Sequence, residues 1–175
     1  NGDDTIVLQD GLLIVNNGPY PIGAVANLTF DSLGGTDSFT VVNKPSTLVT
    51  IEFTGGTGTD SLTGPDGANT WNITGTNTGN LVGDVPVTFI GIESLNGGSS
   101  TDSFIFADDS AALDGAINGG DGIDSIDYSN RNTAVNVNLA TGVATAIGAT
   151  ITSVENLTGT SKTDTVTGPT SDNTW

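Results

Sequence analysis

The chain has 175 residues, and its 20 Asp and Glu outnumber its three Lys and Arg so strongly that the formal net charge at pH 7 is −17. This charge argues against nucleic acid and membrane surfaces as partners, because both carry phosphate that cationic side chains must neutralise. The chain contains no His and no Cys. The usual general base, the thiol nucleophile and disulfides are therefore missing, and we expect a protein that is not an enzyme. No apolar run is long enough for membrane insertion.

The composition also indicates the type of secondary structure. The acids are mostly Asp, a residue that competes for backbone hydrogen bonds and favours turns over helices. Together with 25 Gly and many Thr and Asn, this pattern is typical of strands joined by tight turns. We expect no significant helix.

Taken in chain order, six short motifs begin with Asp, continue with Ser or Thr, and place a large apolar residue third. After each Asp, the residues at +2 and +4 are mostly apolar and those between them mostly polar, which predicts a strand with one buried face. The six motifs are Asp4-Thr5-Ile6, Asp37-Ser38-Phe39, Asp60-Ser61-Leu62, Asp102-Ser103-Phe104, Asp124-Ser125-Ile126 and Asp164-Thr165-Val166.

A second apolar residue stands seven positions before each Asp, wherever the chain extends that far, and Asn or Thr and then Gly follow it in most copies. The spacing predicts one strand, a glycine-rich turn and a second strand in every copy. The preceding apolar residues are Phe30, Phe53, Leu95, Ile117 and Leu157.

The six Asp residues are spaced by 33, 23, 42, 22 and 40 residues, and four of these steps are near one or two times 21. A unit this short cannot bury its own apolar face and must stack on its neighbours. We therefore expect an all-β fold, a parallel β-solenoid resembling a β-helix or β-roll, with roughly eight coils at about 4.8 Å each. The first spacing of 33 requires a long or irregular first coil, and a β-sandwich is the rival fold.

A longer repeat is superimposed on the short one. The segment TGTDSLTGPDGANTW at 57–71 returns as SKTDTVTGPTSDNTW at 161–175, a distance of 104 residues. We expect residues 1–175 to form one continuous β-solenoid segment cut from a longer array, with a superrepeat over 60–163 that restarts at 164. Trp71 and Trp175 hold equivalent positions, which favours a place in the core or at a coil corner over a sugar-stacking role.

Two glycine–aspartate turns offer a candidate metal site. Residues 55–63 and 119–127 both fit the pattern G-G-x-G-x-D-x-U-x, which resembles the nonapeptide of RTX (hemolysin-type) calcium-binding β-rolls. The resemblance implies Ca²⁺ as cofactor, with Asp60 and Asp124 as carboxylate ligands. It implies that the turns are lined by Gly55, Gly56, Gly58, Gly119, Gly120, Gly122 and Asp121, with Asp4, Asp37 and Asp102 as weaker candidates. The alternative is that each Asp caps its own turn by accepting backbone N–H bonds, with no metal.

The order of motifs over residues 53–175 is similar to repeat arrays of giant bacterial adhesin-like and RTX-like beta strand repeat proteins. This resemblance implies an extracellular or cell-surface location and a structural role as part of an adhesin, stalk or fibre. The expected partners are other copies, end to end or lateral, or a cell-surface or matrix polysaccharide. Two alternatives stay open: a Ca²⁺-dependent folding or secretion module of a toxin or hydrolase, and a carbohydrate- or ice-binding Thr ladder, for which Thr74–Thr78 is a candidate run.

Overall fold

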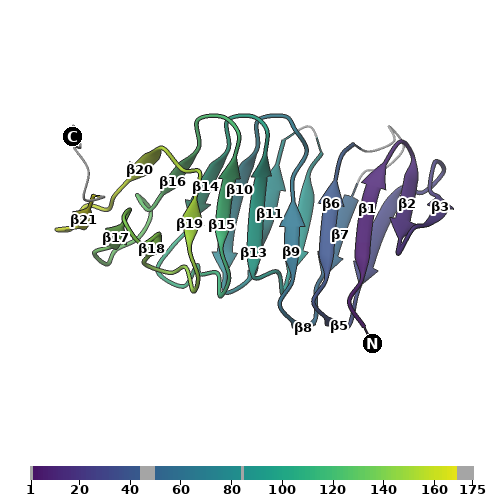
Figure 1. Ribbon diagram of the computed structural model, residues 1–175, viewed down its shortest axis with the longest axis horizontal. Helices are drawn as coiled ribbons and strands as arrows, with labels where there is room; N and C mark the ends of the chain where they lie inside the picture. The colour runs from purple at the N-terminus through teal and green to yellow at the C-terminus, as the bar shows by residue number, and fades with distance from the viewer. Residues whose placement is uncertain (1, 44–49, 84, 169–175) are drawn as a thin grey trace.

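The computed structural model describes residues 2–43, 50–83 and 85–168, and these residues form strands and turns without any helix (Figure 1). Consequently, no helix in these ranges could cross a membrane. Most strands belong to two eight-stranded sheets, A and B. Sheet A contains β1 (Thr5–Gln9), β2 (Leu12–Val15), β3 (Gly18–Pro21), β6 (Ser38–Val41), β9 (Ser61–Thr63), β13 (Ser94–Gly98), β15 (Ile117–Gly120) and β19 (Ile151–Thr152).

Sheet B and two small sheets contain the remaining strands. Sheet B contains β4 (Asn27–Asp31), β7 (Thr50–Thr54), β10 (Thr70–Gly75), β11 (Thr78–Val82), β12 (Val87–Ile90), β14 (Ser103–Phe106), β16 (Ser125–Asp127) and β20 (Asn156–Thr158). The third sheet contains β17 (Asn136–Asn138), β18 (Val143–Ala144) and β21 (Thr165–Thr167). The fourth pairs β5 (Gly34–Gly35) with β8 (Thr57–Gly58).

The chain passes back and forth between sheets A and B, so most neighbouring strands within a sheet are parallel. After β4 in sheet B come β6 in sheet A, β7 in sheet B and β9 in sheet A. In sheet A the strands β1, β6, β9, β13, β15 and β19 lie side by side in parallel. Hydrogen bonds between successive members of this row join residues 33, 23, 33, 22 and 34 positions apart. The strands stack along the longest axis of the molecule (Figure 1).

The steps of 33 and 34 residues contain additional antiparallel strands. The first long step holds β2 and β3, the second holds the meander β10–β11–β12, and the third holds β17 and β18. A step of 33 is therefore a recurring length rather than an irregularity of the first coil. Because long steps use more of the chain, the parallel row of sheet A has six strands, fewer than the roughly eight coils expected.

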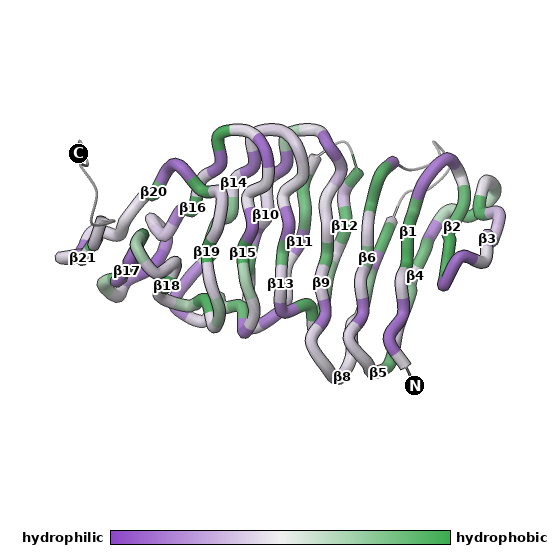
Figure 2. The backbone as a smooth tube through the Cα atoms, viewed as in Figure 1, coloured by the Kyte–Doolittle hydropathy of each residue, from purple (hydrophilic) through white to green (hydrophobic). Residues whose placement is uncertain are grey.

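The core lies between the two sheets, where the alternating apolar residues point inward. Burial alternates along most strands, and Figure 2 shows hydrophobic residues along the strands of both sheets. Phe39 of sheet A packs against Phe53 of sheet B, with ring centroids 4.7 Å apart. Further along, Trp71 stacks on Phe104 at 5.8 Å. Trp71 is fully buried, which confirms its predicted core position; Trp175 lies outside the described residues.

Candidate functional site

A continuous ladder of carboxylates crosses the N-terminal ends of the parallel strands of sheet A, and its central members are buried. Each carboxylate accepts a hydrogen bond from the backbone N–H of the equivalent residue on the previous parallel strand. The bonds run from Asp4 N to Asp37 Oδ1 at 2.7 Å, from Asp37 N to Asp60 Oδ1 at 2.8 Å, and from Asp60 N to Glu93 Oε2 at 2.7 Å. Each acid immediately precedes a strand, and the parallel register of the strands brings the acids together.

A second ladder of the same construction runs along sheet B. The bonds run from Asn69 N to Asp102 Oδ1 at 2.9 Å, from Asp102 N to Asp124 Oδ1 at 2.7 Å, and from Asp124 N to Glu155 Oε2 at 2.8 Å. Each residue of this ladder follows its counterpart in the first by 62 to 65 positions. The same four-residue arrangement therefore occurs once on each sheet, and Glu is the last residue of both ladders.

One oxygen of each central carboxylate is buried without any hydrogen-bond partner. Asp37, Asp60, Asp102 and Asp124 are at most 1 % exposed, and the Oδ2 atom of each is unpaired. In three of the four cases this oxygen packs against a glycine five residues earlier, where a Cβ would collide with it: Gly55, Gly97 and Gly119. The glycine that recurs in the sequence motif therefore makes room for a carboxylate.

Burial makes ionisation of these carboxylates unfavourable. Removal from water raises the pKa of Asp60, and the neighbouring Asp37 carboxylate raises it further. Burial likewise raises the pKa of Asp102 and Asp124, with additional contributions from the carboxylates of Asp124 and Glu155 respectively. Burial also raises the pKa of Glu93, and the neighbouring carboxylates of Asp60 and Asp114 raise this pKa further. The ladder N–H bonds oppose this shift without cancelling it.

The described cations lie away from the ladders. The buried Arg131 donates to the carbonyl oxygens of Asp108 and Ala111 at 3.1 and 3.0 Å, and its Nε lies 3.8 Å from an Asp109 oxygen. Lys162 is exposed in the turn before Asp164. Asp164 departs from the central carboxylates: its Oδ2 accepts from Thr160 N at 2.7 Å, and its hydrogen bonds, above all the one from the backbone N–H of Val135, lower its pKa.

The residues of the two complete nonapeptides do not come together. Asp60 belongs to the ladder of sheet A and Asp124 to the ladder of sheet B, each beside its own glycine turn. Gly55 and Gly119 face those carboxylates, while Gly56, Gly58, Gly120 and Gly122 lie against backbone of the preceding turn in the stack. The Asp121 side chain is exposed, and the backbone N–H of Asp121 donates a hydrogen bond to the carbonyl oxygen of Gly98. The weaker candidates Asp4, Asp37 and Asp102 are all ladder members.

Three members of the ladders, Asn69, Glu93 and Glu155, are not among the residues that the sequence singles out. Glu93 and Glu155 stand nine residues before Asp102 and Asp164, and each precedes a strand just as the Asp residues do. The missed signal was Glu93-Ser94-Leu95, which has the acid–Ser–apolar pattern with Glu in place of Asp. Including it resolves the Asp spacing of 42 into one step of 33 and a shift of nine onto the other sheet.

Ca²⁺ takes six to eight oxygen ligands in proteins. Within residues 2–43, 50–83 and 85–168, no group of three or more acidic side chains is arranged to hold a metal ion. Each central carboxylate uses Oδ1 to accept the N–H of the equivalent residue before the neighbouring parallel strand, rather than an N–H of its own turn.

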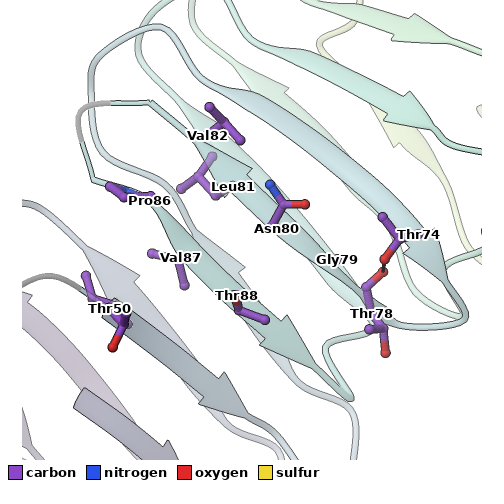
Figure 3. Close-up of a pocket in the computed structure, with 11 residues that line it drawn as sticks. Thr50, Thr74, Thr78, Gly79, Asn80, Leu81, Val82, Pro86, Val87 and Thr88 are labelled. Atoms are coloured by element: carbon purple, nitrogen blue, oxygen red, sulfur yellow. Dashed lines mark hydrogen bonds between the residues drawn. The ribbon is translucent and has the colours of Figure 1, made fainter. Parts of the chain in front are cut away.

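The outward face of sheet B carries a shallow, threonine-rich depression of about 460 Å³ (Figure 3). Thr50, Thr74, Thr78 and Thr88 surround it, with Asn80 at its centre. The run Thr74–Thr78 lies at the turn between β10 and β11, where Thr74 Oγ1 donates to Thr78 O at 3.5 Å. These threonines therefore follow a hairpin rather than a ladder across strands.

Fold and site together define a class: an all-β protein of two mostly parallel sheets, in which ladders of carboxylates join the starts of neighbouring strands. Comparison of the chain with protein-family models, with curated proteins and with solved structures found no match in any of the three.

Proposed function

We propose that this chain is a structural segment of a bacterial extracellular adhesin, stalk or fibre, built as a parallel β-solenoid. The observation that carries the proposal is the row of six in-register parallel strands in sheet A, repeated without a change of direction along the long axis. Such a row makes a stiff rod, because each strand is held by backbone hydrogen bonds to both neighbours. The charge of −17 keeps such a rod soluble and limits non-specific contacts.

We propose that copies of the chain do not associate through the sheet edge formed by β3. Pro19 and Pro21 lie in this edge strand, and proline cannot donate to a ladder of backbone hydrogen bonds. At the opposite end, Leu139, Leu157 and Val166 line an apolar depression of about 300 Å³ beside β19 and β20. End-to-end contact is therefore more favourable there than at β3.

A second candidate role, binding of a neutral polysaccharide, is favoured by the outward face of sheet A. None of the eight strands of this sheet contains a charged residue, although the chain as a whole is strongly acidic. Thr40, Thr63, Asn96, Asn118 and Thr152 follow one another across five parallel strands. Hydroxyl and amide groups in such a row can exchange hydrogen bonds with sugar hydroxyls.

Single-molecule force spectroscopy tests the load-bearing role. With the chain held at both ends, we expect unfolding in steps that release whole 22- to 34-residue units, which at 3.3–3.6 Å per residue correspond to about 7–12 nm. Extension without any force peak, like that of an unstructured chain, would refute the proposal.

A second experiment on the same purified chain distinguishes a structural rod from a Ca²⁺-dependent folding module. Circular dichroism in EGTA should show the β spectrum if the rod is structural. A chain that is disordered in EGTA and becomes β-structured only with millimolar Ca²⁺ would instead support the module.

A further inference from the structure

Strand β4 leaves one edge of sheet B open. Among the described strands, β4 pairs only with β7, and this pair includes a hydrogen bond from Thr50 N to Ala26 O. Because backbone groups alternate in direction along a parallel strand, the N–H and C=O groups of Asn27 and Thr29 face away from β7. β4 contains no proline, so another strand can be added at this edge.

Sheet A continues beyond the level of β4, which leaves part of its inner face uncovered. Phe30 of β4 contacts Phe39 of β6, with ring centroids 5.9 Å apart, and β1, β2 and β3 lie beyond β6 at the purple end of the molecule (Figure 1). Leu13, Val15 and Tyr20 join Phe30 to line an apolar depression of about 420 Å³, and Tyr20 is 56 % exposed. A strand added to β4 would cover this depression.

The other outer strand of sheet B has the same sequence as the start of β4. β20 reads Asn156-Leu157-Thr158, and β4 begins with Asn27-Leu28-Thr29. Among the described strands, β20 pairs only with β16, and Asn156 N donates to Asp124 O. The N–H and C=O groups of Leu157 therefore face the open side of β20.

Parallel neighbours in this chain often place identical residues opposite each other. Leu62 lies opposite Leu95, and Asn96 lies opposite Asn118. The shared sequence of β20 and β4 therefore matches the pairing that the protein already uses between its own strands.

We propose that β20 of one copy pairs in parallel with β4 of a second copy, with Asn156–Thr158 opposite the first three residues of β4. In this register Leu157 directs its backbone groups at β4, while Asn27 and Thr29 direct theirs at β20. This is the alternation that a parallel pair requires. Leu157 and Leu28 come together on the inner face of the extended sheet. The contact is head-to-tail, so its repetition gives a filament.

The two ends are compatible in charge and in polarity. Glu155 is the last residue of the sheet B ladder, and the register places the uncharged Ala26 opposite it. Leu157 shares its depression with Leu139 and Val166, which are exposed apolar side chains. The net charge of −17 on each copy opposes association, and salt screens this repulsion. We therefore expect association to strengthen as the salt concentration rises.

Disulfide cross-linking tests the register, because the chain contains no Cys of its own. Thr29 and Thr158 are both exposed and lie opposite each other in the proposed pair. Adjacent strands lie about 4.8 Å apart, which is within the range of Cα separations that a disulfide can span. A mixture of the T29C and T158C variants should form a covalent dimer on mild oxidation, whereas either variant alone should give little cross-linked product.

N27C mixed with T158C is the matched control for register. Asn27 is exposed like Thr29 but is displaced from it by two residues, about 6.6 Å along the strand. Cross-linking of N27C to T158C as efficient as that of T29C would overturn the proposed register. Efficient dimerisation of T29C alone would overturn the head-to-tail contact, because it would place two β4 edges together.

Sedimentation analysis over a range of protein and salt concentrations tests the association itself. T29P removes an N–H that faces the open edge, so it should raise the dissociation constant about tenfold while the circular dichroism spectrum stays unchanged. If T29P does not fold, the cysteine variants still decide the register. A chain that is monomeric under all these conditions would overturn the inference.

The inference rests on the proposed role as a segment of a fibre, but the two can fail separately. Force spectroscopy is performed on one chain and does not require association. Force peaks from a chain that stays monomeric would overturn strand addition and leave the load-bearing role intact. Specific T29C–T158C cross-linking in a chain without force peaks would support strand addition and refute the load-bearing role.

Discussion

Replacing Trp71 with alanine is expected to lower the free energy of unfolding by about 3–5 kcal/mol. Trp71 is fully buried between the sheets, stacks on Phe104 at an interplanar angle of 11° and contacts Phe89 at 6.3 Å between centroids. Truncation removes this apolar area and leaves a cavity that the stacked strands cannot close without shifting. Urea unfolding followed by circular dichroism measures the loss.

Two controls make the Trp71 result specific. Val82 is 49 % exposed on β11, the strand adjacent to Trp71, and V82A should change the free energy of unfolding by no more than about 0.5 kcal/mol. W71F should be milder than W71A, because it keeps an aromatic ring and removes an indole N–H that has no hydrogen-bond partner. A loss below about 1 kcal/mol for W71A would contradict the core position.

The second large effect is expected at Gly58, in the turn that stacks on the turn of β5. Gly58 has φ +144°, and a Cβ at this position would collide with the carbonyl oxygen of Gly35. G58A should therefore cost about 2–4 kcal/mol, from backbone strain and from overpacking of the turn. Thermal and urea unfolding measure the effect.

Gly75 provides the matched control for Gly58. Its φ is ordinary, and the atom nearest to a Cβ added at this position would be Thr78 Cβ at 4.0 Å. G75A should thus be nearly neutral or slightly stabilising. A G58A variant as stable as G75A would contradict the close stacking of the Gly58 turn on the turn of β5.

The strand and turn composition could be predicted from the sequence because the signals for both are local. Asp37-Ser38-Phe39 and its relatives mark a strand with a buried third residue, and the structure confirms this in five of the six motifs, whereas Val166 of the sixth is 44 % exposed. The sequence pattern also marks the recurring glycine, such as Gly55, as a turn residue. Its close contact with the buried Asp60 oxygen depends on the three-dimensional turn and could not be predicted from spacing alone.

The arrangement of strands between the sheets was harder to predict. The inserted strands, such as β11 and β12, alternate in burial like the parallel strands, so no local pattern separates the two kinds. The change of the Asp motif from sheet A to sheet B after Asp60 was also hidden, since Glu93 continues the first ladder with a different acid. Register, which residues far apart in sequence determine jointly, decides both features.

The sequence did not predict the ladder, because it indicated two other uses for the same residues. Asp60 and Asp124 were candidate metal ligands by resemblance and turn caps by local chemistry. The structure places each carboxylate against the N–H of the preceding strand rather than within its own turn. A hydrogen bond from one strand to the carboxylate of the next requires a particular register of the parallel strands. The sequence pattern indicates parallel strands but does not determine their register.

Detection of hydrogen-bond couplings by NMR tests the ladders most directly. In a long-range experiment that correlates amide nitrogen with the carbon of the accepting group, the amide of Asp37 should couple to the carboxyl carbon of Asp60. The amide of Asp102 should couple likewise to the carboxyl of Asp124. Both couplings together would establish the parallel register and the buried carboxylates in one measurement. Rapid exchange of these two amides with water, with no coupling to any carboxyl group, would contradict both.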